Sequence, residues 1–271
     1  MLNAAISQAL IRGAVGLLIA TAIALGARRA GSLSTSGALA AVCIGTVCAA
    51  AGTSWGALLI VYFIAASLLS RYGRGEKERL TGGVVAKRGA RDATQVLANG
   101  GIYAACLAVA AICPGRIATL MHFQALGALA ASSADTWATE IGTLHGGTPR
   151  SMFTFRRVVP GTSGAISIAG TVAMIAGAAF VAFVAMGLGL PAVPLAVGIG
   201  GIAGAIADSA LGATLQERRW CATCSTSSEQ PVHTCGATTS LAGGLAFLDN
   251  DTVNLLSTVV GGAVAALLAS L

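Results

Sequence analysis

The hydrophobic residues of this chain are gathered into long runs, several of which approach the ~20 residues that a helix needs to cross a bilayer. These runs predict eight membrane-spanning helices, at residues 4–27, 36–52, 55–70, 94–113, 117–136, 164–189, 193–213 and 251–271. The second and third runs are short and close together, so they form either a tight hairpin or a partly inserted pair. The pattern predicts an all-α, polytopic membrane helix bundle, folded as a single membrane-embedded domain over residues 1–271.

The composition agrees with a membrane protein. Apolar residues make up 55% of the chain, only 10% are charged, and the mean hydropathy is +0.81. A soluble domain of this length would be about 25% charged. Glycine is abundant and aromatic residues are scarce, as expected where membrane helices pack with their backbones close together.

The basic residues predict the orientation. Fourteen of the 16 Lys and Arg residues lie in four alternate connections, at residues 28–35, 71–93, 137–163 and 214–250. By the positive-inside rule these connections are cytoplasmic, which places both termini outside. The net charge of +6 follows from this orientation, so it predicts no nucleic-acid partner.

The acidic residues gather at the same membrane face, although the positive-inside rule says little about Asp and Glu. Seven of them lie at or just beyond the cytoplasmic ends of the predicted helices: Asp92, Asp135, Glu140, Asp208, Glu217, Asp249 and Asp251. Charged side chains near a membrane segment are costly and are functional candidates by default. We therefore expect a polar site at the cytoplasmic surface of the bundle.

Two segments that could form this site carry polar residues at helical spacing. Gln95 and Asn99 share one face near the start of a predicted helix, after a basic connection that could neutralise phosphates or could be an ordinary basic loop. The segment 132–142 places a serine, an aspartate and two threonines on one stripe, with a glutamate one turn beyond, namely Ser132, Asp135, Thr136, Thr139 and Glu140. Such a stripe offers carboxylates to a divalent cation and hydroxyls to phosphate. The alternative is a polar helix end in which neighbouring hydroxyls satisfy Asp135.

Two further segments reach the same face. Residues 159–167 form a turn with Thr162 and Ser163 before the sixth run, where free N–H groups at a helix start could bind an anion or merely cap the helix. Asp208 and Ser209 end the seventh run and echo the Asp135-Thr136 pair. Both runs point inward, so the two aspartates could bracket Mg²⁺, which prefers oxygen ligands.

At this point the sequence resembles the family of integral membrane proteins that includes transmembrane protein 19 and phytyl-phosphate kinase. The resemblance extends from about residue 70 to residue 254 and rests on six segments, at residues 75–77, 91–100, 135–142, 159–164, 208–213 and 248–254. It implies a membrane kinase that transfers the γ-phosphate of a nucleotide, CTP above others, to an isoprenyl monophosphate such as phytyl or geranylgeranyl phosphate. The product would be the diphosphate. The phosphate-binding P-loop signature is absent from the sequence.

This interpretation gives each candidate residue a role. Asp135, Glu140, Asp208 and Lys77 form the expected catalytic set, with Lys77 at the donor phosphates. Asp135, Asp208 and Asp251 are the expected Mg²⁺ ligands, with Glu140 as a further orienting group. The residues expected to bind nucleotide or substrate are Arg91, Gln95, Asn99, Thr136, Thr139, Thr162, Ser163, Ser209, Asn250 and Asn254.

One cluster departs from the pattern of that family. Cys221, Cys224, His233 and Cys235 all lie in the connection 214–250. Four soft ligands that begin with a Cys-x-x-Cys pair suit tetrahedral Zn²⁺. The alternative is a group of free or redox-linked thiols. A structural zinc is therefore a candidate second metal.

The competing function is a secondary transporter or channel for a small ion or metabolite. Glycine-rich helices and polar groups in the membrane suit one. Transport sites, however, usually lie near the bilayer midplane on broken helices, whereas these acids cluster at one face. The sequence also leaves the oligomeric state open, a homodimer included.

Overall fold

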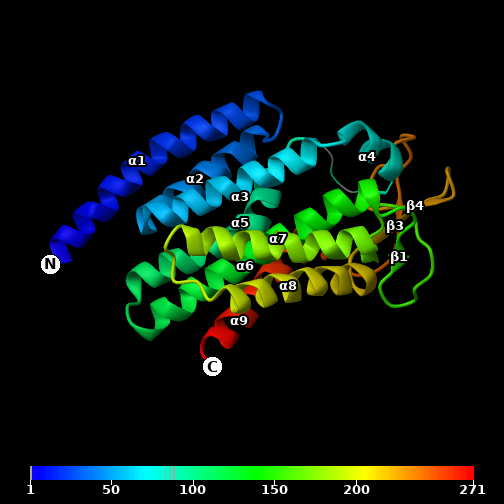
Figure 1. The fold of residues 1–271 in the computed structure, drawn as a ribbon. Coiled ribbons are helices and arrows are strands. Elements are labelled where there is room, and N and C mark those ends of the chain that lie inside the picture. The colour runs from blue at the N-terminus through cyan, green and yellow to red at the C-terminus, as the bar shows by residue number, and fades with distance from the viewer. Residues whose placement is uncertain (1, 83, 86, 88) are drawn as a thin grey trace.

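The computed structural model describes residues 2–82, 84–85, 87 and 89–271 (Figure 1). Residues 83, 86 and 88 of the predicted connection 71–93 lie outside this set. The described part contains nine helices: α1 (Leu2–Arg29), α2 (Thr35–Ala51), α3 (Thr53–Arg71), α4 (Arg74–Thr81), α5 (Ala93–Ile112), α6 (Arg116–His145), α7 (Ile168–Gly187), α8 (Pro194–Thr214) and α9 (Asn250–Ala269).

The polytopic helical architecture is confirmed. Seven of the described helices are long and apolar enough to cross a membrane, while α2, with 17 residues, is shorter. That length still lies at the lower end of the range for a membrane-spanning helix. Gly52 joins α2 to α3 without an intervening loop, and both termini lie away from the end of the molecule that carries the strands (Figure 1).

The connections predicted as loops contain regular structure. The segment 71–93 holds the short helix α4, and α6 continues beyond the predicted end at residue 136 as far as His145. Strands β1 (Arg150–Ser151) and β2 (Ala165–Ile166) pair antiparallel. The last long connection folds into the antiparallel sheet β4-β3-β5, built from β3 (Arg218–Cys221), β4 (Thr226–Ser228) and β5 (Ser240–Gly243). Helix α4 and these strands gather at one end of the bundle (Figure 1).

Glycines bring α6, α8 and α9 into backbone contact. A Cβ added to Gly204 of α8 would lie 2.4 Å from the Ala131 Cβ of α6 and 2.8 Å from the Ser257 carbonyl oxygen of α9. A Cβ on Gly127 of α6 would lie 2.5 Å from the Gly261 carbonyl oxygen of α9. Distances this short exclude any side chain, so these helices pack as the abundance of small residues predicts.

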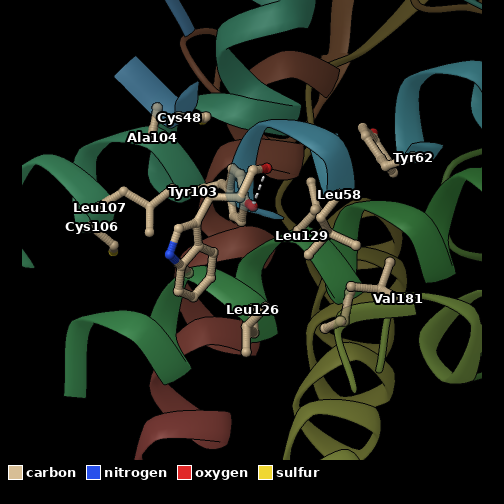
Figure 2. Packing of buried hydrophobic residues seen from close by; sticks show 14 of the residues in the cluster. Cys48, Leu58, Tyr62, Tyr103, Ala104, Cys106, Leu107, Leu126, Leu129 and Val181 are labelled. Carbon is tan, nitrogen blue, oxygen red and sulfur yellow. Dashed lines mark hydrogen bonds between the residues drawn. The ribbon is translucent and has the colours of Figure 1, made fainter. Parts of the chain in front are cut away.

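Larger side chains form the core between α2, α3, α5, α6 and α7. Tyr103 of α5 is fully buried, and its hydroxyl donates a hydrogen bond of 2.9 Å to the carbonyl oxygen of Trp55 (Figure 2). Leu58, Leu126 and Leu129 pack in the same cluster. This core fixes α5 against α3 and α6, the helices whose ends carry many of the predicted site residues.

Candidate active site

A polar cavity of about 430 Å³ opens at the end of the bundle where α3, α6 and α8 end and where α5, α7 and α9 begin. All fourteen residues predicted for catalysis or for nucleotide and substrate binding line it: Lys77, Arg91, Gln95, Asn99, Asp135, Thr136, Thr139, Glu140, Thr162, Ser163, Asp208, Ser209, Asn250 and Asn254. They come from α4, α5, α6, α8, α9 and the connecting segments. The fold therefore brings together segments that are far apart in the sequence, while the roles of the residues remain predictions.

Asp135 and Asp208 line this cavity from the C-terminal halves of α6 and α8. The Oδ2 oxygen of Asp208 is inaccessible and accepts no hydrogen bond from the described residues. The two carboxylates are close enough for their charges to interact. Buried polar atoms almost always have a partner, and two neighbouring carboxylates repel each other unless a cation lies between them. Carboxylate oxygens are the ligands that Mg²⁺ prefers, and the role of this pair as a cation site remains a prediction.

Trp137, which follows the Asp135-Thr136 pair, packs between α6 and α7. Its ring packs at a tilt of 34° against Phe180 of α7, with ring centroids 5.3 Å apart. A Cβ on Gly177 would lie 2.9 Å from Trp137 Cγ. The tryptophan thus fixes the rotation of α6 against α7, which in turn directs Asp135 toward the cavity.

Lys77 is engaged by protein groups rather than free for a phosphate. Its ammonium donates to the carbonyl oxygens of Leu69 and Ser70, at 2.8 and 3.2 Å, and forms an ion pair with Glu140. The Ser70 hydroxyl donates to the second Glu140 oxygen at 2.5 Å, and Arg91 donates to that hydroxyl at 2.8 Å. Lys77 therefore links α4 to the end of α3 and to α6, a positioning arrangement that the sequence did not indicate.

Asp251 is not brought to the cavity wall with the other predicted metal ligands. Its carboxylate accepts hydrogen bonds from Lys87, at 2.5 Å, and from Thr94, at 2.7 Å. Lys87 also pairs with Asp92, the N-cap of α5. Burial raises the pKa of Asp92, but hydrogen bonds from Lys87 and from the Gln95 N–H outweigh it and lower that pKa to about 2. Asp251 thus joins a lysine-centred cluster that ties α9 to the start of α5.

Gln95 and Asn99 share a face of α5, as predicted, and each has a structural partner. The Gln95 side chain closes the capping box of α5 by accepting from the Asp92 N–H at 3.1 Å. Asn99 accepts from Ser132 at 2.7 Å, and Tyr62 lies 2.6 Å from the same serine hydroxyl. Side chains held by such bonds present a fixed polar surface to the cavity.

The turn at residues 159–164 lines the cavity but does not start the helix that follows. Strand β2 intervenes, and α7 begins at Ile168 with Ser167 as its N-cap. The predicted helix-start anion site is therefore displaced from Thr162 and Ser163 by several residues. Gly164 adopts φ +73°, and a Cβ there would lie 2.4 Å from the Ala213 Cβ, so a close approach to α8 requires this glycine.

Residues that were not predicted from the sequence line the same cavity, among them Arg74, Lys87, Ser67 and Glu229. Arg74 and Lys87 add positive charge, and Ser67 has a buried hydroxyl without a hydrogen-bond partner among the residues described. Glu229 follows strand β4 directly, lines the cavity and accepts a hydrogen bond from Ser163. The basic pattern of the connection 71–93 could have indicated the two cations, but nothing in the sequence indicated the glutamate.

A second cavity, of about 490 Å³ and almost entirely apolar, lies between α1, α2, α3 and α5. Ile19, Ile23 and Leu59 are among its walls. It reaches from Ala24 to Ile11 along α1, a distance of about 20 Å at the helical rise. Three residues line both cavities, namely Arg91, Gln95 and Asn99. The polar cavity therefore adjoins an apolar one through a cationic and amide-bearing wall.

The four predicted zinc ligands also come together, outside the cavity. The ligand atoms of Cys221, Cys224, His233 and Cys235 all lie within 4.8 Å of one another. Within the part of the chain that the structure describes, it is the one group of three or more His, Cys, Asp or Glu side chains whose ligand atoms lie this close together. It belongs to the β3-β4-β5 region.

Comparisons with known proteins give the chain a family. The family described as "Integral membrane protein DUF92" matches residues 18–262. Protein PGR of Arabidopsis thaliana is 31% identical over 89% of this chain and 90% of its own length. A membrane protein of Methanocaldococcus jannaschii is 30% identical over 96% of each chain. Protein VTE6, chloroplastic, also of Arabidopsis thaliana, is 29% identical over 87% of this chain and 65% of its own length. No solved structure matches the chain.

Proposed function

The chain belongs to this DUF92 family of integral membrane proteins, and we propose that it is a membrane kinase acting on a lipid phosphate. The substrate would be an isoprenyl monophosphate such as phytyl or geranylgeranyl phosphate, and the donor a nucleoside triphosphate, CTP before others. The family resemblance seen in the sequence supports both choices. We place the polar cavity on the cytoplasmic side, where nucleotides are available.

One observation carries the proposal: a polar cavity rich in phosphate-binding groups adjoins an apolar cavity inside the bundle. A phosphorylated lipid has the same two parts. Its phosphate would lie against Arg91, Gln95 and Asn99, the residues common to both cavities. Its hydrocarbon chain would fill the space lined by α1, α2, α3 and α5. The chain of a membrane lipid is already in an apolar surrounding, so it would be held in this cavity by van der Waals contacts and shape rather than by removal from water.

The polar cavity fits a phosphoryl transfer. In this reaction an oxygen of the lipid monophosphate forms a bond to the γ-phosphorus, and the bond from that phosphorus to the β–γ bridging oxygen breaks. The nucleoside diphosphate leaves. Catalysis of this kind depends on positioning and on neutralising charge rather than on covalent chemistry by the protein. An attacking phosphate is already largely ionised near neutral pH, so no strong general base is required.

Asp135 and Asp208 would hold Mg²⁺, because Asp208 has a buried oxygen without a partner and the two carboxylates interact. The ion would neutralise the nucleotide phosphates. Arg74 and Arg91 would supply further positive charge, and Thr136, Thr139 and Ser209 would supply hydroxyls. Glu140 would hold α4 and the end of α3 at the edge of the cavity through its ion pair with Lys77.

The alternative of a transporter or channel receives less support. The carboxylate pair lies in the C-terminal halves of α6 and α8, whereas transport sites usually lie on discontinuous helices. Helices α6 and α8 are continuous past Asp135 and Asp208.

The test is transfer of labelled phosphate by the purified full-length protein in detergent with Mg²⁺. CTP, ATP, GTP and UTP would be compared with phytyl and geranylgeranyl monophosphate as acceptors, and the diphosphate product measured. Asp135→Asn should lower the rate by at least about 100-fold, the scale for losing one strong transition-state contact. Glu76→Gln is the matched control, because Glu76 is exposed and its ion pair within the described part of the chain is with Arg79.

Two outcomes would contradict the proposal. One is full activity in Asp135→Asn protein. The other is ion flux in proteoliposomes without any nucleotide turnover, which would favour the transporter instead.

A further inference from the structure

The Cys221, Cys224, His233 and Cys235 cluster has the spacing of a closed metal site. The sulfur atoms of Cys221 and Cys235 are 3.7 Å apart, and His233 Nδ1 lies 3.2 Å from Cys235 Sγ. Zn–S bonds of about 2.3 Å and Zn–N bonds of about 2.0 Å at tetrahedral angles separate neighbouring ligand atoms by about 3.5–3.8 Å. These two separations are close to those values, and all four ligand atoms lie within 4.8 Å of one another.

We propose that these four side chains bind one structural Zn²⁺. Three thiolates and an imidazole complete the coordination of the ion, which leaves no open position for a substrate or an activated water. The site is separate from the proposed Mg²⁺ site and does not depend on the proposed kinase function.

The local backbone is shaped to present the ligands. Cys221 ends β3, Cys224 lies in the turn to β4, and the antiparallel pairing of β3 with β4 resumes at Thr226. His233 and Cys235 lie in a second turn, which is closed by hydrogen bonds of 2.8–2.9 Å between the backbone of His233 and that of Gly236 and Ala237. Two turns that face each other, each with two ligands, are the usual construction of a structural zinc site.

The sheet lacks the apolar core that would otherwise hold it together. Within residues 216–247 the described buried side chains are polar or metal-binding ones: Gln216, Cys221, Ser228, His233 and Thr239. A unit of about 30 residues without a hydrophobic core usually needs a disulfide or a metal. Disulfides are disfavoured in a reducing cytoplasm, where we place this face. A metal ion therefore supplies the cross-link that this sheet needs.

This cross-link stabilises the wall of the polar cavity. The Glu229 N–H donates to the Val84 carbonyl oxygen at 2.8 Å, and the Gln230 side chain donates to the Val85 carbonyl oxygen at 2.8 Å. Glu229 also accepts a hydrogen bond from Ser163 in the 159–164 turn. The zinc-bound sheet thus holds two cavity-lining segments in place from outside.

The test is the metal content of the full-length protein, purified in detergent under reducing conditions and measured by elemental mass spectrometry. We expect about one zinc per chain. Reconstitution of the metal-free protein with Co²⁺ should give the visible bands of tetrahedral cobalt bound by thiolates. Cys221→Ser should lose the metal, whereas Cys43→Ser should keep it, because Cys43 lies in α2 and outside the cluster.

The design stays decisive if the Cys221→Ser protein fails to fold. In that case a thiol-blocking reagent added to the wild-type protein should release zinc to a colorimetric chelator as the cluster thiols react. A wild-type protein that holds no zinc and shows no cobalt bands would overturn the proposal. A Cys221–Cys235 disulfide in protein isolated from a reducing cytoplasm would also overturn it.

Discussion

The helices α6, α8 and α9 touch backbone to backbone. Helices α1 and α2 also meet closely, since a Cβ on Gly16 would lie 2.3 Å from the Ala49 Cβ, but α1, α2, α3 and α5 leave an apolar cavity beside this contact. In α6, 61% of the most apolar segment is buried inside the protein, compared with 11% in α1. A Cβ on Gly204 would meet Ala131 at 2.4 Å, so the first group has no room for an added atom. The second group borders a partly open apolar cavity of about 490 Å³.

Under the proposed function, the difference corresponds to two kinds of recognition. Phosphoryl transfer requires carboxylates and phosphates to be held within fractions of an ångström, and glycine-mediated contacts hold α6 and α8 that closely. A hydrocarbon chain is held by van der Waals contacts, which are non-directional. The closely packed helices therefore suit the chemistry, and the open ones suit the lipid chain.

The largest effect is expected from a side chain inserted into the closely packed group. Gly204→Val would push α8 away from Ala131 and Ser257, and it would separate Asp208 from Asp135. We expect phosphoryl transfer to fall by at least about 100-fold, because misplacement by about 1 Å has effects of that size. Gly198→Val is the control, since a Cβ there meets no atom within 4 Å. Equal activity of the two variants would show that close packing is not needed.

A smaller effect is expected at the buried ion pair that joins α4 to α6. Lys77→Met would leave Glu140 without its cation in a largely buried place, and it should lower the free energy of unfolding by about 3 kcal/mol. Adding Glu140→Gln should recover part of that loss. The measurement is thermal unfolding in detergent. If the double variant is no more stable than Lys77→Met, the pair does not position α4.

The smallest effect is expected in the helices that line the apolar cavity, α1, α2, α3 and α5. It changes substrate choice rather than stability. Ala57 lines the apolar cavity near the start of α3, far from the polar end. Ala57→Phe should raise the KM for geranylgeranyl phosphate by about 10-fold, the scale of a lost hydrophobic contact, and should leave the KM for geranyl phosphate unchanged. Ile64→Phe on the same helix is the control, because Ile64 is 50% exposed. A parallel loss for both lipids would contradict the assignment of the cavity.

Much of the fold was predictable from local features. The apolar runs located the helices because a bilayer imposes a minimum length on any apolar segment that crosses it. The hydroxyl and carboxylate stripe on α6 and the Asp208 segment of α8 also led to the candidate site, since a single helix determines which of its residues share a face. The last part of α6 and the helix α4 were not predicted, because their polar residues lie outside the bilayer and form no long apolar run.

Several features depended on contacts between distant segments. The pairing of Asp251 with Lys87 and the engagement of Lys77 by Glu140 join residues far apart in the chain. The sequence placed both cations in a basic connection but could not say which carboxylate each would meet. The apolar cavity could not be predicted either, because the sequences of its walls do not differ from those of other membrane helices.

The sequence by itself determined that this is a polytopic helical membrane protein with a polar site at one face, and that four soft ligands lie in one connection. Hydrophobic run length, charge distribution and short-range spacing are sufficient for those conclusions. Only the tertiary structure decided that Asp208 keeps a buried oxygen without a partner, that Asp251 is paired instead, and that the polar cavity adjoins an apolar one. Burial, pairing and empty space are properties of side chains brought together from different helices, and no single segment contains them.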